Sequence, residues 1–222
     1  MSIIYHESSK TFHLYNNDIS YIMMVLSNEH LGNLYFGKKI HDKEDFSYLF
    51  EMKQRPMTAC VYESNRKFSL EHLKLEYPVY GSSDYRQPAV EILQENGSRI
   101  SDFTYVSHTI INGKPKLQGL PATYTEKDEE AQTLCVKLKD KVTGIVLELL
   151  YTIFSHGGII TRSARLTNEG VSPVHLLSAM SLSLDLPDKD YVWMQFSGAW
   201  SRERHVKERR LEQGIQSVGS IR

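Results

Sequence analysis

The sequence predicts an all-β protein, a large antiparallel β-supersandwich with at most one or two short helices. Short segments in which apolar and polar residues alternate recur along the chain, and turns separate them at fairly even spacing. A helical spacing of apolar residues is found at one place. Because sandwiches of this size often form undivided, we expect a single domain over residues 1–222.

The expected strands are best defined in the second half of the chain. Residues 134–139 alternate apolar and mostly polar side chains, residues 160–167 do so less regularly, and residues 180–186 alternate cleanly. Residues 144–154 are nearly all apolar and rich in β-branched and aromatic side chains. That composition is typical of a strand covered on both faces, although the pattern alone leaves a buried helix open.

Two Asn-Gly pairs predict tight turns. Asn96-Gly97 and Asn112-Gly113 each lie between β-like runs. Asn-Gly is the strongest two-residue signal for a hairpin, because both residues accept positive φ. We therefore expect one hairpin at each pair.

One short helix is expected near residue 46. Asp42 can cap it, and Phe46, Leu49 and Phe50 follow at the i, i+3, i+4 spacing of a helix face, before Pro56.

Charge and cysteine content exclude several classes of protein. The formal net charge is -1, and nucleic-acid binding needs a basic face, so we expect no nucleic-acid partner. Cys60 and Cys135 are far apart in the sequence, so neither a disulfide framework nor a zinc site is expected. Residues 1–7 lack the features of a secretory signal, and the apolar stretch 22–26 is too short to span a bilayer. These observations predict a cytoplasmic protein with no membrane partner.

The chain carries no self-contained catalytic or cofactor motif. Its nine histidines are scattered singly, and no glycine-rich phosphate loop or Gly-x-Ser-x-Gly sequence occurs. We therefore expect no metal, no cofactor and no catalytic residue. The densest basic run, residues 202–210, is either a phosphate-binding patch or a solvated strand or inter-domain surface. The second interpretation is favoured, because Glu203 and Glu208 offset part of the charge.

Five ordered segments are more specific than these patterns. They are residues 32–40 (GNLYFGKKI), 76–89 (EYPVYGSSDYRQPA), 120–124 (LPATY), 160–170 (ITRSARLTNEG) and 198–200 (GAW) with Glu203 and Arg204. Together they resemble the amino-terminal region of family 36 of the glycoside hydrolases, whose bacterial members are mainly α-galactosidases. The resemblance covers essentially the whole chain.

The resemblance implies a parent enzyme about three times as long as this chain. In such an enzyme a β-supersandwich is followed by a (β/α)8 barrel with the active site and by a small β-domain. The implied reaction is hydrolysis of terminal α-D-galactosyl residues, as in melibiose and raffinose, with retention of configuration by two aspartates of the barrel. This chain is then expected to be a non-catalytic fragment, and residues 217–222 are typical of a hairpin cut in mid-course.

The resemblance also implies homo-oligomers, often tetramers, in which a loop of the sandwich reaches the barrel mouth of a neighbouring subunit. The matching stretch is residues 42–57. By this resemblance Asp45 accepts hydrogen bonds from galactose hydroxyls, and Arg55 donates to hydroxyls or holds the loop. Phe46 and Tyr48 wall the site. Each also has a structural alternative, with Asp45 as a carboxylate of a first helical turn, Arg55 as a surface charge and Phe46 as packing.

Two other functions are left open. The thirteen tyrosines allow a stand-alone carbohydrate-binding sandwich, since aromatic faces stack on sugars, although ordinary strand packing explains the same residues. An aldose-epimerase-like sandwich would use His156 or His175 as acid with Glu148 or Glu169 as base. No motif in the sequence brings such a pair together.

Overall fold

A computed structural model of the chain describes residues 1–50, 52, 54, 62–71, 73–81, 84–119 and 122–219. Strands dominate these residues, and their only helical elements are two single 3-10 turns, η1 (Ser47–Leu49) and η2 (Asp128–Glu130). The strands are β1 (Ser2–His6), β2 (Thr11–Tyr15), β3 (Ile19–Val25), β4 (Leu31–Lys38), β5 (Val90–Gln94), β6 (Phe103–Asn112), β7 (Ala131–Asp140), β8 (Ile145–Phe154), β9 (Ile160–Asn168), β10 (Val174–Ala179), β11 (Val192–Ala199) and β12 (Arg202–Arg210). The predicted all-β class is confirmed.

The chain divides into two compact units, Met1–Asp185 and Leu186–Arg222. The smaller unit is built on the antiparallel hairpin of β11 and β12. The basic run of residues 202–210 is strand β12, and its side chains are exposed along its whole length. It therefore has the form of a solvated strand.

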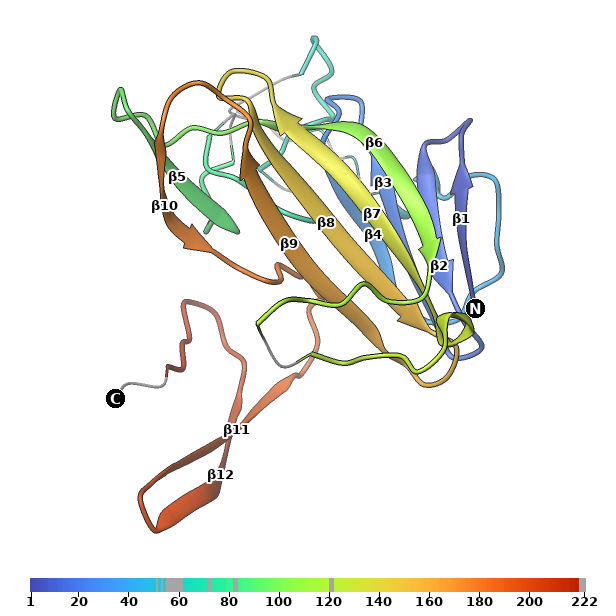
Figure 1. Cartoon of the computed structure of the whole chain (residues 1–222), viewed down its shortest axis with the longest axis vertical. Helices are drawn as coiled ribbons and strands as arrows, with labels where there is room; N and C mark the ends of the chain where they lie inside the picture. The colour runs from blue at the N-terminus through green and yellow to red at the C-terminus, as the bar shows by residue number, and fades with distance from the viewer. Residues whose placement is uncertain are drawn as a thin grey trace. The chain divides into compact units, whose positions relative to one another are not determined.

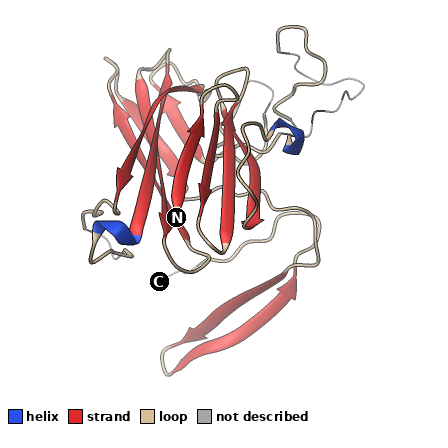
Figure 2. Cartoon of the chain, turned by 90° about the vertical axis from the view of Figure 1, so that its right-hand side faces the viewer, coloured by secondary structure: helices blue, strands red, loops and turns tan. Residues whose placement is uncertain are grey.

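The larger unit is a two-layer sandwich. One sheet has the order β1-β2-β3-β4 and the other β6-β7-β8-β9, and all neighbours are antiparallel. The two sheets lie face to face, with β6–β9 in front of β2–β4 in Figure 1 and the layers side by side in Figure 2. Strands β5 and β10 form a separate antiparallel pair.

The core fills the space between the sheets. Phe12 and Leu14 of β2 meet Leu147 and Tyr151 of β8 in one cluster, and all four are fully buried. Each large apolar side chain that leaves water contributes about 1.5–3 kcal/mol. The alternation of β7 directs every second side chain inward, whereas β8 is apolar almost throughout and buries most of its side chains.

The first sheet is also covered on its outer face. Ile22 of β3 and Leu34 of β4 pack against Phe46, which belongs to the segment 39–50 that follows β4. His13 lies on the same outer face and is fully buried. The segment 39–50 thus closes a second, smaller apolar cluster on the side away from the main core.

The prediction of a helix near residue 46 is wrong. Only the 3-10 turn η1 forms, with Phe46 rather than Asp42 at its amino-terminal cap position and no side-chain cap bond. Asp42 instead binds two histidines of the first sheet. A full helix would need its apolar side chains on one buried face, and here Phe46 alone is fully buried whereas Leu49 and Phe50 lie half-buried.

The two Asn-Gly pairs give turns but no two-residue hairpins. Gly97 and Gly113 adopt the expected positive φ of 83° and 79°. No strand follows either turn directly, however, and β6 reaches its partner β7 only after a long connection. The hairpin prediction is therefore wrong at both pairs.

The strand predictions hold in three of four cases. Residues 134–139 lie in β7, residues 144–154 match β8 and not a helix, and residues 160–167 lie in β9. Residues 180–186 form no strand. The start of that segment is held by Tyr77, whose hydroxyl donates to the Met180 carbonyl at 2.8 Å.

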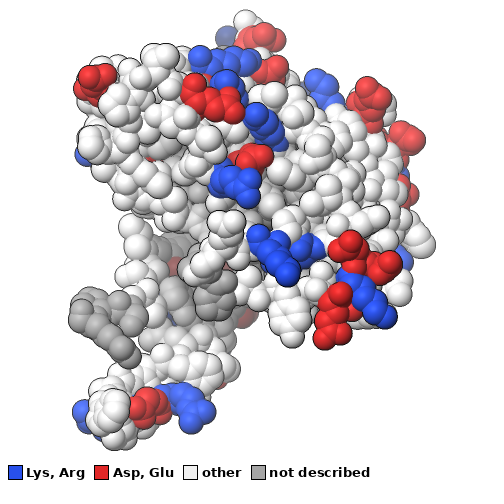
Figure 3. Space-filling model, viewed as in Figure 1, with Lys and Arg blue, Asp and Glu red and all other residues white. Residues whose placement is uncertain are grey.

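Charged side chains of both signs are interspersed on the face of the molecule in Figure 3. Within the described residues, no helix is long and apolar enough to cross a membrane. Cys135 is a half-buried thiol, and burial raises its pKa. Cys60 lies outside the described residues.

Candidate functional site

The segment that carries the predicted site residues is attached to the first sheet through Asp42. Its Oδ1 lies 2.6 Å from Nδ1 of His13 on β2 and 3.1 Å from Nε2 of His6 on β1. The other ring nitrogen of His13 lies 2.9 Å from the Ser20 hydroxyl of β3. The same hydroxyl accepts a 3.0 Å hydrogen bond from the Ile40 amide. Residues 40–42 are therefore bonded to the sheet at both ends, through the Ile40 amide and the Asp42 carboxylate.

Two of the predicted site residues lie exposed beyond this attachment. The Asp45 carboxylate accepts hydrogen bonds from the backbone amide and hydroxyl of Ser47, at 2.7 Å and 2.8 Å. These bonds lower the pKa of Asp45. The ring of Tyr48 is 61% exposed and has the Lys43 ammonium 5.1 Å from its centroid. Both side chains are accessible to a ligand or a neighbouring chain.

Phe46 is placed differently from the prediction. Its ring is fully buried and meets the ring of His13 edge-on, with centroids 5.2 Å apart. A ring in that position packs under the segment and is not available as a wall for a sugar. The burial of Phe46 supports the packing alternative. Arg55 lies outside the described residues.

A second polar cluster lies inside the sandwich around Glu76. This side chain is fully buried. Its carboxylate oxygens accept 2.8 Å hydrogen bonds from the Tyr21 hydroxyl of β3, the Tyr151 hydroxyl of β8 and the Asn33 amide of β4. A buried carboxylate needs such donors, because an unpaired one costs several kcal/mol.

Arg162 of β9 supplies the opposite charge. Its Nη2 lies 3.2 Å from Oε2 of Glu76, and the Arg162 side chain is only 8% exposed. The guanidinium also donates to the backbone carbonyls of Glu76 and Ser183, both at 2.9 Å, and stacks 4.8 Å from the centroid of the Tyr151 ring. The planar fork of arginine suits this set of partners, which lysine could not satisfy.

Burial and neighbouring charges together set the protonation of this cluster. The pKa values of Tyr21 and Tyr151 are raised well above the usual range, first by burial and then by the charge of Glu76. Burial alone would lower the pKa of Arg162, but Tyr151 and Glu76 outweigh it and the pKa rises. Both tyrosines therefore stay protonated as donors, and Arg162 stays charged.

Glu76 and Arg162 are not among the site residues predicted from the sequence. The sequence held a signal, because Glu76 stands between the large apolar residue Leu75 and the aromatic Tyr77. Three segments of the family resemblance meet here: the segment with Asn33, the segment with Glu76 and the segment with Arg162. Part of the resemblance therefore lies in residues of the interior of this fold.

The epimerase pairs do not come together. Glu148 pairs with Arg165 at 3.4 Å, and Glu169 pairs with Lys139 at 3.0 Å. Among the hydrogen bonds and ion pairs of the described residues, none joins either carboxylate to His156 or His175. Nor does any group of three or more His, Cys, Asp or Glu side chains in that part of the chain converge as a metal site.

Two facing antiparallel sheets define the larger unit as a β-sandwich (Figure 1, Figure 2). The whole chain belongs to the glycosyl hydrolase family 36 N-terminal domain family, whose model matches residues 29–222.

Individual relatives agree with this assignment. The chain is 41% identical over 222 residues to α-galactosidase AgaA of Geobacillus stearothermophilus, and the match covers 100% of this chain and 30% of AgaA. The crystal structure of the α-galactosidase from Lactobacillus brevis matches with a TM-score of 0.94 at 40% identity, over 99% of this chain and 30% of that one. A variant of AgaA in complex with raffinose matches with a TM-score of 0.87 at 42% identity, over 93% and 29% of the two chains. This chain thus spans about 30% of the length of these relatives.

Proposed function

We propose that this chain is the non-catalytic amino-terminal domain of an α-galactosidase that hydrolyses terminal α-D-galactosyl residues of oligosaccharides such as melibiose and raffinose. The proposal rests on one observation. The whole of this chain is 41% identical to a stretch of α-galactosidase AgaA that makes up 30% of that enzyme. The AgaA variant with bound raffinose supports the substrate class.

The catalytic groups are assigned to the remainder of the enzyme. A retaining glycosidase needs two carboxylates about 5 Å apart. Glu76 and Glu148 of this chain are paired with arginines instead, Glu76 with Arg162 and Glu148 with Arg165. The family match spans both compact units, and this supports a single domain over residues 1–222. A homo-oligomer, in particular a tetramer, and a cytoplasmic location belong to the same proposal.

Hydrolysis of a chromogenic α-galactoside tests this assignment. The purified 222 residues are expected to be inactive, and the full-length protein that contains them is expected to be active and to cleave raffinose. Turnover by the 222 residues, in a preparation free of host enzyme, would place the catalytic groups here. An inactive but folded full-length protein would contradict the assigned reaction.

Asp45 and Tyr48 are proposed to complete the active site of a neighbouring subunit. Their exposure on a firmly attached segment supports this role. In the full-length enzyme, Asp45→Ala should lower kcat/KM by about one to two decades, because charge-assisted hydrogen bonds to galactose are lost.

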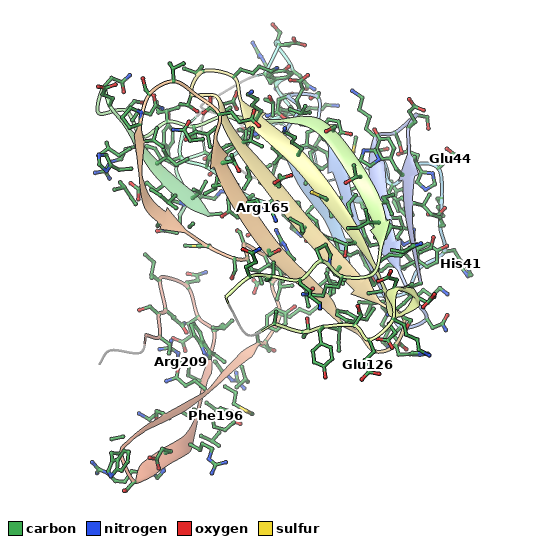
Figure 4. All side chains as sticks on the ribbon, in the orientation of Figure 1. His41, Glu44, Glu126, Arg165, Phe196 and Arg209 are labelled. Atoms are coloured by element: carbon green, nitrogen blue, oxygen red, sulfur yellow. The ribbon has the colours of Figure 1, made fainter. Side chains whose placement is uncertain are left out.

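The matched control is Glu126→Ala, an exposed carboxylate on a different connection (Figure 4). It should leave kcat/KM unchanged. Light scattering must show that the Asp45→Ala enzyme keeps its oligomeric state, since dissociation would remove the neighbouring segment altogether. Unchanged kcat/KM in an intact Asp45→Ala oligomer would rule out the active-site role.

A further inference from the structure

Asp42 differs from the other charged side chains of its segment. The side chain of Glu44 is 84% exposed, whereas that of Asp42 is 29% exposed and turns toward the sheet. His41 and Glu44 lie along the outer edge of the molecule, near β1 (Figure 4). Asp42 is thus the acidic residue of this stretch that faces inward.

One neutral arrangement of protons satisfies the hydrogen bonds around Asp42. The Ser20 hydroxyl accepts from the Ile40 amide, so its own proton is available to Nε2 of His13. His13 then carries its proton on Nδ1 and donates it to Asp42 over 2.6 Å. His6 adds a second donor through Nε2. A neutral His13 in this tautomer satisfies every partner.

The electrostatic environment agrees with this arrangement. Burial lowers the pKa of His13, although Asp42 opposes the shift. Burial alone would raise the pKa of Asp42, but the hydrogen bonds from His13 and His6 outweigh it and the pKa falls. Asp42 is therefore a carboxylate held by charge-assisted hydrogen bonds, which are about twice as strong as neutral ones.

These contacts place Asp45 between two fixed points. Asp42 is bonded to β1 and β2, and the Phe46 ring is buried against β3 and β4. Three residues span at most roughly 10 Å when extended, so fixing residues 42 and 46 confines residue 45 to a narrow region. A displacement of about 1 Å in a positioning group can cost about a hundredfold in rate.

We propose that Asp42, through His6 and His13, is the positioning residue of the segment that presents Asp45 and Tyr48. The kinetic part of this inference rests on the proposed function of Asp45, whereas the structural part does not. Asp42 does not touch substrate. It fixes where the exposed residues lie.

The structural part is tested on the 222-residue chain. Asp42→Ala should speed hydrogen exchange of the residue 40–50 amides by at least about tenfold, while the amides of β7 and β8 stay protected. The side-chain nitrogen spectrum of His13 should also lose the signature of protonated Nδ1. Asp42→Asn keeps an acceptor oxygen and should restore part of the protection. His41→Ala, an exposed neighbour, is the matched control and should change neither readout. Unchanged exchange and an unchanged His13 spectrum in Asp42→Ala would overturn the inference.

The kinetic part uses a double-mutant cycle in the full-length enzyme. Asp42→Ala should lower kcat/KM by about tenfold alone and by clearly less in the Asp45→Ala background, because only its effect through Tyr48 remains there. If the decrease in kcat/KM of the double variant equals the product of the two single decreases, the positioning role of Asp42 is overturned. If Asp45→Ala alone has no effect, the proposed function of Asp45 fails, and the exchange experiment still decides whether Asp42 orders the segment.

Discussion

Two carboxylates, Glu76 and Asp42, show how the same chemistry serves different ends. Each accepts hydrogen bonds from several side chains of different strands. Glu76 is fully enclosed between the sheets and has Arg162 as a counter-ion, whereas Asp42 is 29% exposed on the outer face and is held by histidines. The difference in burial separates the two roles. The buried Glu76 cluster joins the two sheets, whereas the partly exposed Asp42 cluster holds the segment 39–50 on the outer face.

The largest expected effect comes from breaking the buried pair. Arg162→Ala should reduce the free energy of unfolding by about 3–5 kcal/mol, because it leaves the Glu76 carboxylate buried without its counter-ion. Urea denaturation followed by circular dichroism measures this loss. Arg165→Ala on the same strand is the control, since the exposed pair with Glu148 contributes about 0–1 kcal/mol. Equal losses of unfolding free energy in the two variants would mean that the buried ion pair contributes no more to stability than the exposed one.

A smaller loss is expected from removing one donor to Glu76. Tyr151→Phe keeps the ring in the core but deletes the hydroxyl 2.8 Å from the carboxylate, and should cost about 1.5–3 kcal/mol. Tyr124→Phe, at a ring that is 75% exposed, should stay within about 0.5 kcal/mol of the wild type. Denaturation midpoints of the two variants compare the sites directly, and a neutral Tyr151→Phe would show that the other donors suffice.

Acid should destabilise the protein through the outer cluster of Asp42 and His13. The pKa of His13 lies below its ordinary value of 6.5, so the unfolded chain binds more protons as the pH falls through 6.5 and stability decreases. Asp42, with a pKa below 3.8, adds stability that is present above its ordinary pKa and lost as the pH falls through the folded value.

This pH dependence can be measured from urea midpoints between pH 7.5 and pH 5.5. His13→Gln removes one titrating group and should flatten the dependence relative to the wild type. An identical slope in the two proteins would exclude His13 as a contributor.

The smallest effect on stability is expected at Asp45. Its carboxylate is exposed, so Asp45→Ala should leave the thermal midpoint almost unchanged while kcat/KM of the full-length enzyme falls. Differential scanning fluorimetry provides the midpoint. A decrease as large as that of Arg162→Ala would mean that Asp45 is structural.

The sequence by itself determined the strands in which apolar residues alternate or run together. Residues 134–139 and 144–154 became β7 and β8 because one or both faces of each strand must leave water. The ordered motifs likewise determined the family, since they cover both units of the chain. The exposed position of Asp45 near the start of a turn is also a local property.

Tertiary structure decided what depends on partners distant in the sequence. Residues 180–186 alternate like a strand but form no ladder, because a strand exists only where a neighbour supplies its hydrogen bonds. Asp42 binds His13, 29 residues away, rather than capping a helix. Glu76 receives donors up to 86 residues away, so its burial as a charge could not be inferred locally. A charged side chain is stable in a core only where the tertiary structure supplies its partners.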